Sequence, residues 1–162
     1  MNINEQIAQY QGGKLLGNLT PERVLDFAKE LQLDKIKGIS ITSPAMTKEF
    51  LRTQLKSSKT EVFHVIFLDT RHRVIKVEDI FQGTIDGACV YPRVVAEKAL
   101  KCDAAAIICA HNHPSGVPEP SLADQAITRR LKDALLLLEI RLLDHFIIGD
   151  GEPVSMASRG ML

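Results

Sequence analysis

Two histidines, a serine and an aspartate follow one another closely in this sequence. They are His111, His113, Ser121 and Asp124, with the spacing His-x-His-x7-Ser-x2-Asp. Imidazole and carboxylate groups are suitable zinc ligands, whereas calcium requires more oxygen ligands. Catalytic zinc sites typically keep three protein ligands and hold a water in the fourth position. The spacing therefore predicts one zinc ion per chain, bound by the two histidines and the aspartate, and hydrolysis as its chemistry.

Hydrolysis also needs groups that move protons and stabilise charge. Bound zinc lowers the pKa of its water to about 7, and a general base is still useful for passing a proton to the leaving group. Glu61 is the first candidate, because a carboxylate at the start of a buried apolar segment is partly desolvated; Glu78 is the fallback. A surface carboxylate at a strand end would have the same spacing. Ser121 could donate a hydrogen bond to the oxyanion or orient the water.

Each part of this pattern also has an interpretation without a metal. Ser121-x-x-Asp124 is an ordinary helix-capping pattern, and both roles can coexist in one helical turn. A single His-x-His is common. The other histidines have no partner at ligand spacing, so we expect them to be structural: His64, His72 and His145.

Other zinc chemistries lack their motifs here. The cysteines are Cys89, Cys102 and Cys109, an odd number with no Cys-x-x-Cys pair, which argues against a disulfide framework and a thiolate zinc knuckle. We expect them to be buried small hydrophobic residues, although Cys109 would share a strand face with the histidines. The His-x-Glu and later Pro-Cys-x-x-Cys of zinc deaminases are absent, as is the His-Glu-x-x-His of zincins.

The predicted ligands must be positioned by the elements around them. Residues 104–110 are small and apolar and predict a buried strand that leads into His111. Residues two apart in extended backbone point the same way, so both imidazoles can reach one ion. Three prolines and a glycine in residues 114–120 predict a rigid loop. A long helix starting at Ser121 then brings Asp124, in its first turn, back over the histidines.

The rest of the chain alternates between helical and strand patterns. Helices are expected over 20–33, from Ser43-Pro44, and over 92–101; strands are expected over 61–68, 74–80, 141–148 and near Val154, the last two joined by a hairpin at Asp150-Gly151. The continuous apolar run at 61–68 is typical of a strand buried on both faces. This alternation predicts an α/β or α+β fold with a mixed sheet.

Composition limits the class of protein. The 162 residues are 45% hydrophobic and 25% charged, which is enough for a full core and argues against disorder. No apolar run approaches the roughly 20 residues that span a bilayer, and no secretory signal is evident, so we expect a cytoplasmic protein with no membrane partner. The net charge is zero. This counts against a protein held on nucleic-acid phosphates.

On these residues the sequence resembles a known family. The His-x-His-x7-Ser-x2-Asp pattern is similar to the JAMM motif of MPN-domain metalloproteases, which include deubiquitinating isopeptidases and prokaryotic relatives. More narrowly, residues 43–162 resemble the RadC family of bacteria. The matching segments are EVFHVIFLDTRHRVI, FQGTIDGACVYPRVV, AAAIICAHNHPSGVPEPSLAD and IRLLDHFIIG.

The resemblance implies an MPN-like mixed β-sheet flanked by helices, with zinc at the sheet edge. It implies that His111, His113 and Asp124 are the ligands, Ser121 the motif serine and Glu61 the catalytic glutamate. It divides the chain into an N-terminal helical extension, residues 1–42, and an MPN (JAMM) domain, residues 43–162. Longer RadC-type proteins carry a helix-hairpin-helix module associated with DNA binding. Here about 42 residues precede the MPN-like part and lack a Gly-x-Gly hairpin, so the chain resembles the short form found in mobile elements.

Three functions follow as hypotheses. The first is a zinc-dependent peptidase or isopeptidase of JAMM type, acting on a peptide or protein substrate. The second, which rests on the resemblance and on small arginine clusters, is a factor associated with DNA repair that acts on or near DNA. The third is an MPN scaffold without catalysis, which an intact ligand set disfavours. No segment specifies a substrate pocket or an oligomeric state.

Overall fold

The computed structural model of this chain describes residues 10–11, 14–15, 28, 31, 35–41, 43–55, 60–83 and 90–162. The chain divides into two compact units, Met1–Ile36 and Lys37–Leu162. In the first unit, β1 (Tyr10–Gln11) pairs antiparallel with β2 (Lys14–Leu15). Most of the helix expected over 20–33 lies outside the described residues. The predicted boundary between residues 42 and 43 remains a prediction.

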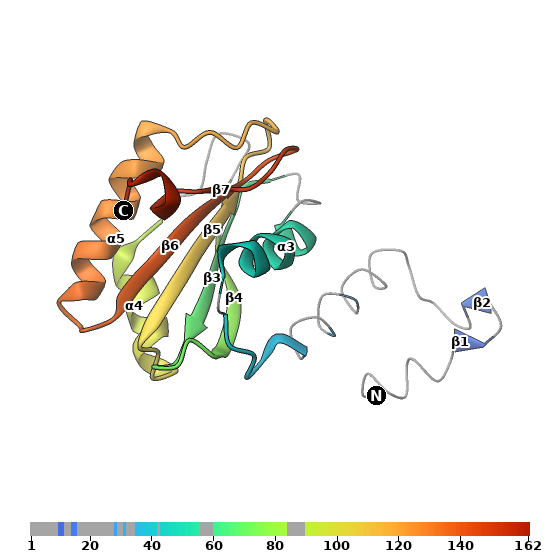
Figure 1. The fold of residues 1–162 in the computed structure, drawn as a ribbon, viewed down its shortest axis with the longest axis horizontal. Coiled ribbons are helices and arrows are strands. Elements are labelled where there is room, and N and C mark those ends of the chain that lie inside the picture. Colours follow the sequence, from blue (N-terminus) through green and yellow to red (C-terminus); the bar gives the residue numbers. More distant parts are fainter. Residues whose placement is uncertain are drawn as a thin grey trace. The chain divides into compact units, whose positions relative to one another are not determined.

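The second unit is built on a five-stranded mixed sheet with the strand order β4-β3-β5-β6-β7 (Figure 1). Its elements are α3 (Pro44–Leu55), β3 (Val62–Leu68), β4 (Val74–Gln82), α4 (Pro92–Lys101), β5 (Ala106–Asn112), α5 (Leu122–Leu136), β6 (Arg141–Ile148), β7 (Val154–Ser155) and the short 3-10 helix η1 (Ala157–Arg159). The predicted helices and strands of this unit are confirmed within a few residues. No helix in the described ranges is long and apolar enough to cross a bilayer.

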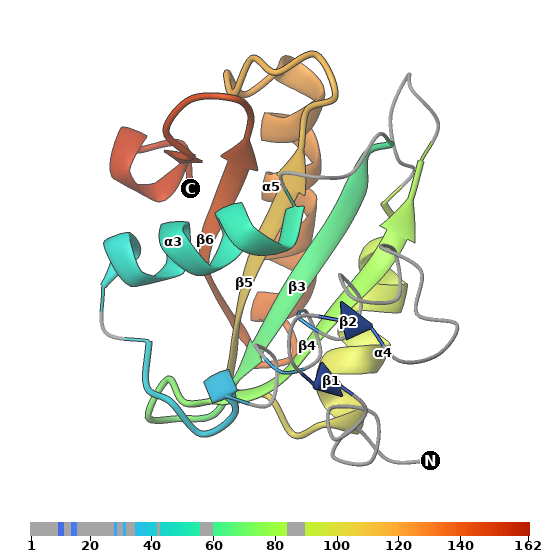
Figure 2. The same cartoon turned by 90° about the vertical axis from the view of Figure 1, so that its right-hand side faces the viewer.

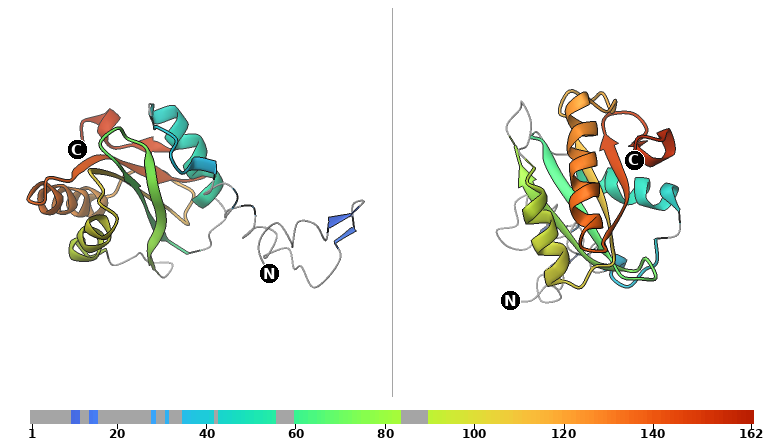
Figure 3. Two further views of the ribbon diagram at one scale, coloured as in Figure 1. Left: turned by 90° about the horizontal axis from the view of Figure 1, so that it is seen from below. Right: turned by 90° about the vertical axis from the view of Figure 1, so that its left-hand side faces the viewer.

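Helices cover both faces of the sheet. Helices α4 and α5 lie side by side on one face, and α3 lies on the other (Figures 2 and 3). Alternate residues of β3 point to the face covered by α4 and α5: Phe63, Val65 and Phe67. They share one apolar core cluster with Val95 and Ala99 of α4 and with Leu131 and Leu135 of α5. All seven residues of β3 are buried, which confirms the expectation from the continuous apolar run.

Strand β5 makes the sheet mixed, because it pairs antiparallel with β3 and parallel with β6. Helix α5 is the crossover between these two parallel strands, as such connections require. The carboxyl end of β5 and the first turn of α5 therefore lie at the same edge of the sheet. The predicted mixed α+β architecture is confirmed.

One strand boundary differs from the prediction. We expected His111 just past the end of a strand, but β5 continues through Asn112. The reason is pairing on both sides: His111 lies opposite Phe63 of β3 and Ile147 of β6, and Asn112 lies opposite Ile148. His111 is thus fixed by two strand ladders, and only His113 belongs to the following loop.

Candidate metal centre

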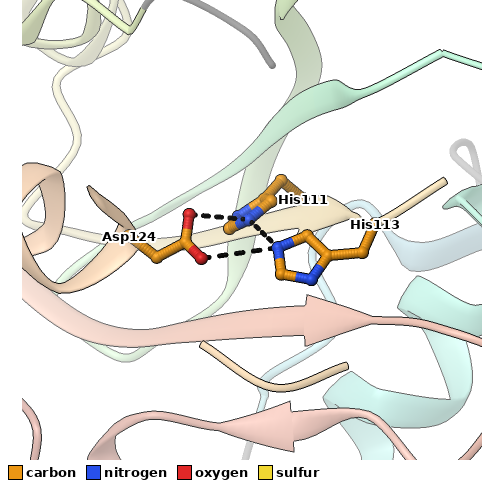
Figure 4. Close-up of side chains that lie close together, drawn as sticks. All are labelled: His111, His113 and Asp124. Carbon is orange, nitrogen blue, oxygen red and sulfur yellow. Dashed lines mark hydrogen bonds and ion pairs between the residues drawn. The ribbon is translucent and has the colours of Figure 1, made fainter. Parts of the chain in front are cut away.

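Three side chains converge at the edge of the sheet: His111 from β5, His113 from the next loop and Asp124 from the first turn of α5 (Figure 4). His111 Nε2 lies 3.0 Å from His113 Nε2 and 3.1 Å from Asp124 Oδ1, and His113 Nε2 lies 3.4 Å from Asp124 Oδ2. Zinc bonds of about 2.0–2.1 Å in a tetrahedron put neighbouring ligand atoms about 3.3 Å apart. The two imidazoles face different oxygens of Asp124, and each of these contacts is close to the separation that one small tetrahedral ion requires. One ligand atom from each of the three residues lies within 4.8 Å of the other two.

The ring of His113 is held by the loop that follows it. Its backbone N–H donates to the Ile148 carbonyl at 2.8 Å, and its Nδ1 lies 2.8 Å from the Val117 carbonyl. A carbonyl oxygen only accepts, so the hydrogen of His113 is on Nδ1. Its Nε2 lone pair is consequently directed toward His111 and Asp124.

Ser121 and Asp124 form a capping box at the start of α5. The Ser121 hydroxyl accepts from the Asp124 N–H at 3.1 Å, and the Ser121 N–H donates to Asp124 Oδ2 at 2.7 Å. The hydroxyl also lies 2.6 Å from Oδ2. The same carboxylate faces both histidines, so the capping interpretation and the ligand interpretation coexist, as the sequence allowed. The cap fixes the orientation of the predicted ligand.

The charges of these groups depend on one another. Burial would raise the pKa of Asp124, but His111 and His113, which donate to this carboxylate when they are protonated, outweigh burial and hold this pKa well below its usual range. The pKa of His113 is raised above its usual value, chiefly because the protonated ring can also donate from Nε2 to Asp124. The centre therefore presents an anionic carboxylate beside two imidazoles, the donor set of a divalent transition metal.

Glu61 directly precedes β3, whose first residues pair with the end of β5 that carries His111. The negative charge of Glu61 contributes to the raised pKa of His113, so the two side chains are close enough to interact. Continuing the antiparallel register beyond the Phe63–His111 pair places Glu61 opposite His113. Asn112 fixes the backbone on both sides of it: its Oδ1 accepts from Val62 N–H at 2.8 Å, and its Nδ2 donates to the Thr60 carbonyl at 3.0 Å.

Glu78, the fallback glutamate, lies elsewhere. It is on β4, opposite Val65, and is separated from β5 by β3. Its carboxylate forms ion pairs with Lys98 of α4 and, at 3.0 Å, with Lys76. Burial would raise the pKa of Glu78, but the two lysines outweigh burial and lower it. The structure thus brings Glu61, and not Glu78, to the predicted metal centre.

His145 is the residue that the sequence analysis did not connect to the centre. It is fully buried on β6, and its Nε2 lies 2.9 Å from His111 Nδ1. An extra residue in β6, between the positions opposite Ile107 and Ile108, shifts the strand register and turns His145 to the face that carries His111. A bulge leaves no clear mark in sequence; the only signal was a histidine directly before the apolar end of the strand, Phe146–Ile148.

The remaining candidates lie outside the centre. Cys109 is fully buried in the core under α4 and α5, and burial raises the pKa of its thiol, which confirms the expectation of a small core residue. His64 pairs with Asp79 at 2.5 Å, and the His72 ring lies 3.2 Å from Arg141 on the surface. Cys89 lies outside the described residues.

Comparison with known proteins identifies relatives of the whole unit. Residues 41–161 match the family described as RadC-like JAB domain. A UPF0758 protein of Halorhodospira halophila is 56% identical over 126 residues, which are 78% of this chain and 56% of that protein. A UPF0758 protein of Vibrio parahaemolyticus is 49% identical over 159 residues, 98% of this chain and 71% of that protein. The chain thus spans a little over half of the first relative's length. The resemblance of this chain to the short RadC form found in mobile elements remains a prediction.

Proposed function

This chain belongs to the RadC-like JAB domain family, and we propose that it is a zinc-dependent hydrolase that cleaves peptide or isopeptide bonds. The observation that carries the proposal is the donor set: the two imidazole Nε2 atoms lie 3.0 Å apart, and each lies 3.1–3.4 Å from one carboxylate oxygen of Asp124. Two imidazoles favour zinc over magnesium or calcium, which prefer oxygen ligands. Three protein ligands leave the fourth tetrahedral position for water, as in catalytic zinc sites.

The chemistry then divides among a few groups. Bound zinc would supply a Lewis acid that polarises the scissile carbonyl and acidifies a water. Glu61 is the general base: its carboxylate takes a proton from the attacking water and delivers it to the leaving amine. Because Asn112 holds the backbone on either side of Glu61, the backbone of this residue stays at a fixed place relative to the strand that carries the proposed ligands.

Ser121 has two proposed roles that compete for one proton. Its hydroxyl lies 2.6 Å from Asp124 Oδ2, so in the structure it supports a ligand. Donation to a developing oxyanion would require the hydroxyl to turn from Asp124 toward the substrate. Ser121→Ala separates these roles: loss of zinc affinity indicates the first, and loss of turnover at full zinc occupancy indicates the second.

The direct test combines metal analysis with cleavage of a library of peptide and isopeptide substrates. We expect about one zinc per wild-type chain and loss of zinc in His113→Ala. Glu61→Gln should keep the zinc and lose roughly 10²–10⁴-fold in turnover. Glu78→Gln is the matched control and should retain turnover, because that carboxylate pairs with lysines away from the ligands. A wild-type chain that neither retains zinc nor is stabilised by it would refute the proposal.

Two outcomes would favour the other functions. Full zinc occupancy without cleavage of any amide substrate would indicate a scaffold that keeps its metal. DNA affinity that falls steeply with salt would indicate a factor acting on DNA. The zero net charge of the chain gives no support to the latter.

A further inference from the structure

A buried chain of hydrogen-bonding groups connects the ring of one proposed ligand to the backbone of another. His111 Nδ1 lies 2.9 Å from His145 Nε2, and His145 Nδ1 lies 2.6 Å from Thr128 Oγ1. Thr128 Oγ1 in turn lies 2.6 Å from the Asp124 carbonyl oxygen. His111 is 2% exposed, and His145 and Thr128 are completely buried, so water does not compete for these contacts.

The direction of each hydrogen bond follows from counting protons, beginning at the Asp124 carbonyl. That oxygen only accepts, so the single hydroxyl proton of Thr128 is donated to it. Thr128 Oγ1 must then accept from His145, whose hydrogen is therefore on Nδ1. In a neutral imidazole the other nitrogen is an acceptor, so His145 Nε2 accepts from Nδ1–H of His111. The lone pair of His111 is left on Nε2, the atom that faces His113 and Asp124.

We propose that His145 and Thr128 are positioning residues of the metal centre, which fix His111 as the tautomer whose Nε2 can bind the ion. The proposal rests on the proposed function and extends it to residues that touch neither the ion nor the substrate. Metal-bound histidines generally donate their other ring N–H to an acceptor that sets tautomer and orientation. The Val117 carbonyl serves His113 in this way, and His145 serves His111.

Packing limits the alternatives to this arrangement. The Phe63 ring stacks on His111, with an interplanar angle of 15° and a centroid distance of 6.2 Å, and meets the His145 ring edge-on at 5.4 Å. Both imidazoles are therefore held in place from the β3 side. Thr128 lies one helical turn after Asp124 on α5. The hydrogen bonds of Thr128 therefore also connect the first turn of α5, which carries Asp124, to β6.

Two substitutions at one position give a matched test. Thr128→Val keeps the shape of the side chain and removes the hydroxyl, whereas Thr128→Ser keeps the hydroxyl. Measured by competition with a chelator on folded protein, the zinc affinity of Thr128→Val should fall roughly 10–100-fold, the usual effect of losing such an outer partner. Thr128→Ser should stay within a few-fold of wild type. A merely structural role would lower the melting temperature of Thr128→Val and leave the affinity of its folded form unchanged.

The outcomes separate this proposal from the proposed function. A wild-type chain that binds no zinc refutes both. A wild-type chain that binds zinc, with equal affinities in Thr128→Val and Thr128→Ser, refutes the positioning role alone. If the valine variant does not fold, the wild-type chain still decides: ring ¹⁵N chemical shifts should show hydrogen on Nδ1 of both His145 and His111. Hydrogen on Nε2 of His145 would overturn the proposal.

Discussion

Asn112 shows how one side chain between two proposed ligands can position a third functional group. It lies between His111 and His113 in sequence, but its amide contacts the backbone of the segment before β3. The carbonyl side of the amide meets an N–H and the NH₂ side meets a carbonyl, so the amide orientation is determined by its partners. The two contacts bracket Glu61, so the strand of the proposed ligands holds the backbone of the proposed base at a fixed offset.

Asn112→Asp tests this role with a change of one atom. The carboxylate can still accept from the Val62 N–H, but it cannot donate to the Thr60 carbonyl and places two oxygens against each other. Because Asn112 is buried, we expect the free energy of unfolding to fall by about 1–3 kcal/mol, measured by urea unfolding. We also expect slower cleavage at unchanged zinc content, measured by kinetics and metal analysis.

Gln82→Glu is the control for this prediction. The exposed amide of Gln82 donates to the Thr60 hydroxyl, and its loss should lower the free energy of unfolding by less than about 0.5 kcal/mol. Wild-type behaviour of Asn112→Asp would contradict the role.

Asp124 makes the metal-free chain sensitive to acid. Its pKa in the folded state is held below the unfolded value of about 3.9, so its charged form favours folding. That contribution is fully present above about pH 4 and is lost as pH falls toward the lower, folded pKa. We expect the unfolding free energy of metal-free wild type to decline in this window, measured by urea unfolding at several pH values. Asp124→Asn should flatten the decline, and Asp133→Asn, on the exposed side of α5, should not.

At the scale of elements, the loop that carries His113 is clamped against the end of β6. Gly116 N–H donates to the His113 carbonyl at 2.9 Å, and the Gly116 carbonyl accepts from Asp150 N–H at 2.8 Å. Gly116 has a φ of +81°, which a residue with a side chain rarely adopts. Close approach of Gly149 completes the clamp: a Cβ there would lie 2.3 Å from the Gly116 carbonyl oxygen. The loop therefore leaves no room for a Cβ at Gly149.

Gly149→Ala should therefore displace the loop and, with it, His113. We expect about 1–3 kcal/mol of destabilisation, the usual cost of overpacking, together with weaker zinc binding. Gly151→Ala is the matched control, because a Cβ at that position meets nothing within 4 Å and the stability should be nearly unchanged. Chemical unfolding and chelator competition measure the two effects. Equal zinc affinity in both variants would show that the clamp does not position His113.

The sequence predicted the elements better than their registers. Continuous apolar runs and a capped amphipathic helix depend on local composition, and the structure has both where they were expected. The cluster of three proposed ligands was predictable because these residues are close in sequence and share one strand–loop–helix unit. His145 was not, because a bulge in β6 decides which face it occupies. The amide contacts of Asn112 were not predictable either, because they depend on the register between β3 and β5.

At the scale of the whole molecule, the centre exists only when several parts of the second unit are in place. The proposed ligands come from β5, its loop and α5, while their orientation depends on β3 and β6. In an unfolded chain His111 and His113 are still neighbours in sequence. Asp124 and the acceptors that direct the two rings no longer lie beside them. A metal that binds the folded chain much more tightly than the unfolded chain must stabilise the fold.

Zinc should therefore raise the melting temperature of metal-free protein in a concentration-dependent way. At a free zinc concentration 100 times the Kd, binding adds about 2.7 kcal/mol to the unfolding free energy. A chain of this size gains roughly 2–4 °C per kcal/mol, so a rise of about 5–11 °C is expected in a thermal scan. Calcium at the same concentration should produce no such rise, because two of the three donor atoms are imidazole nitrogens. His113→Ala should lose most of the rise with zinc while still unfolding cooperatively, since His113 is partly exposed and outside the apolar core. An equal rise in wild type and His113→Ala would mean that zinc binds the chain somewhere else.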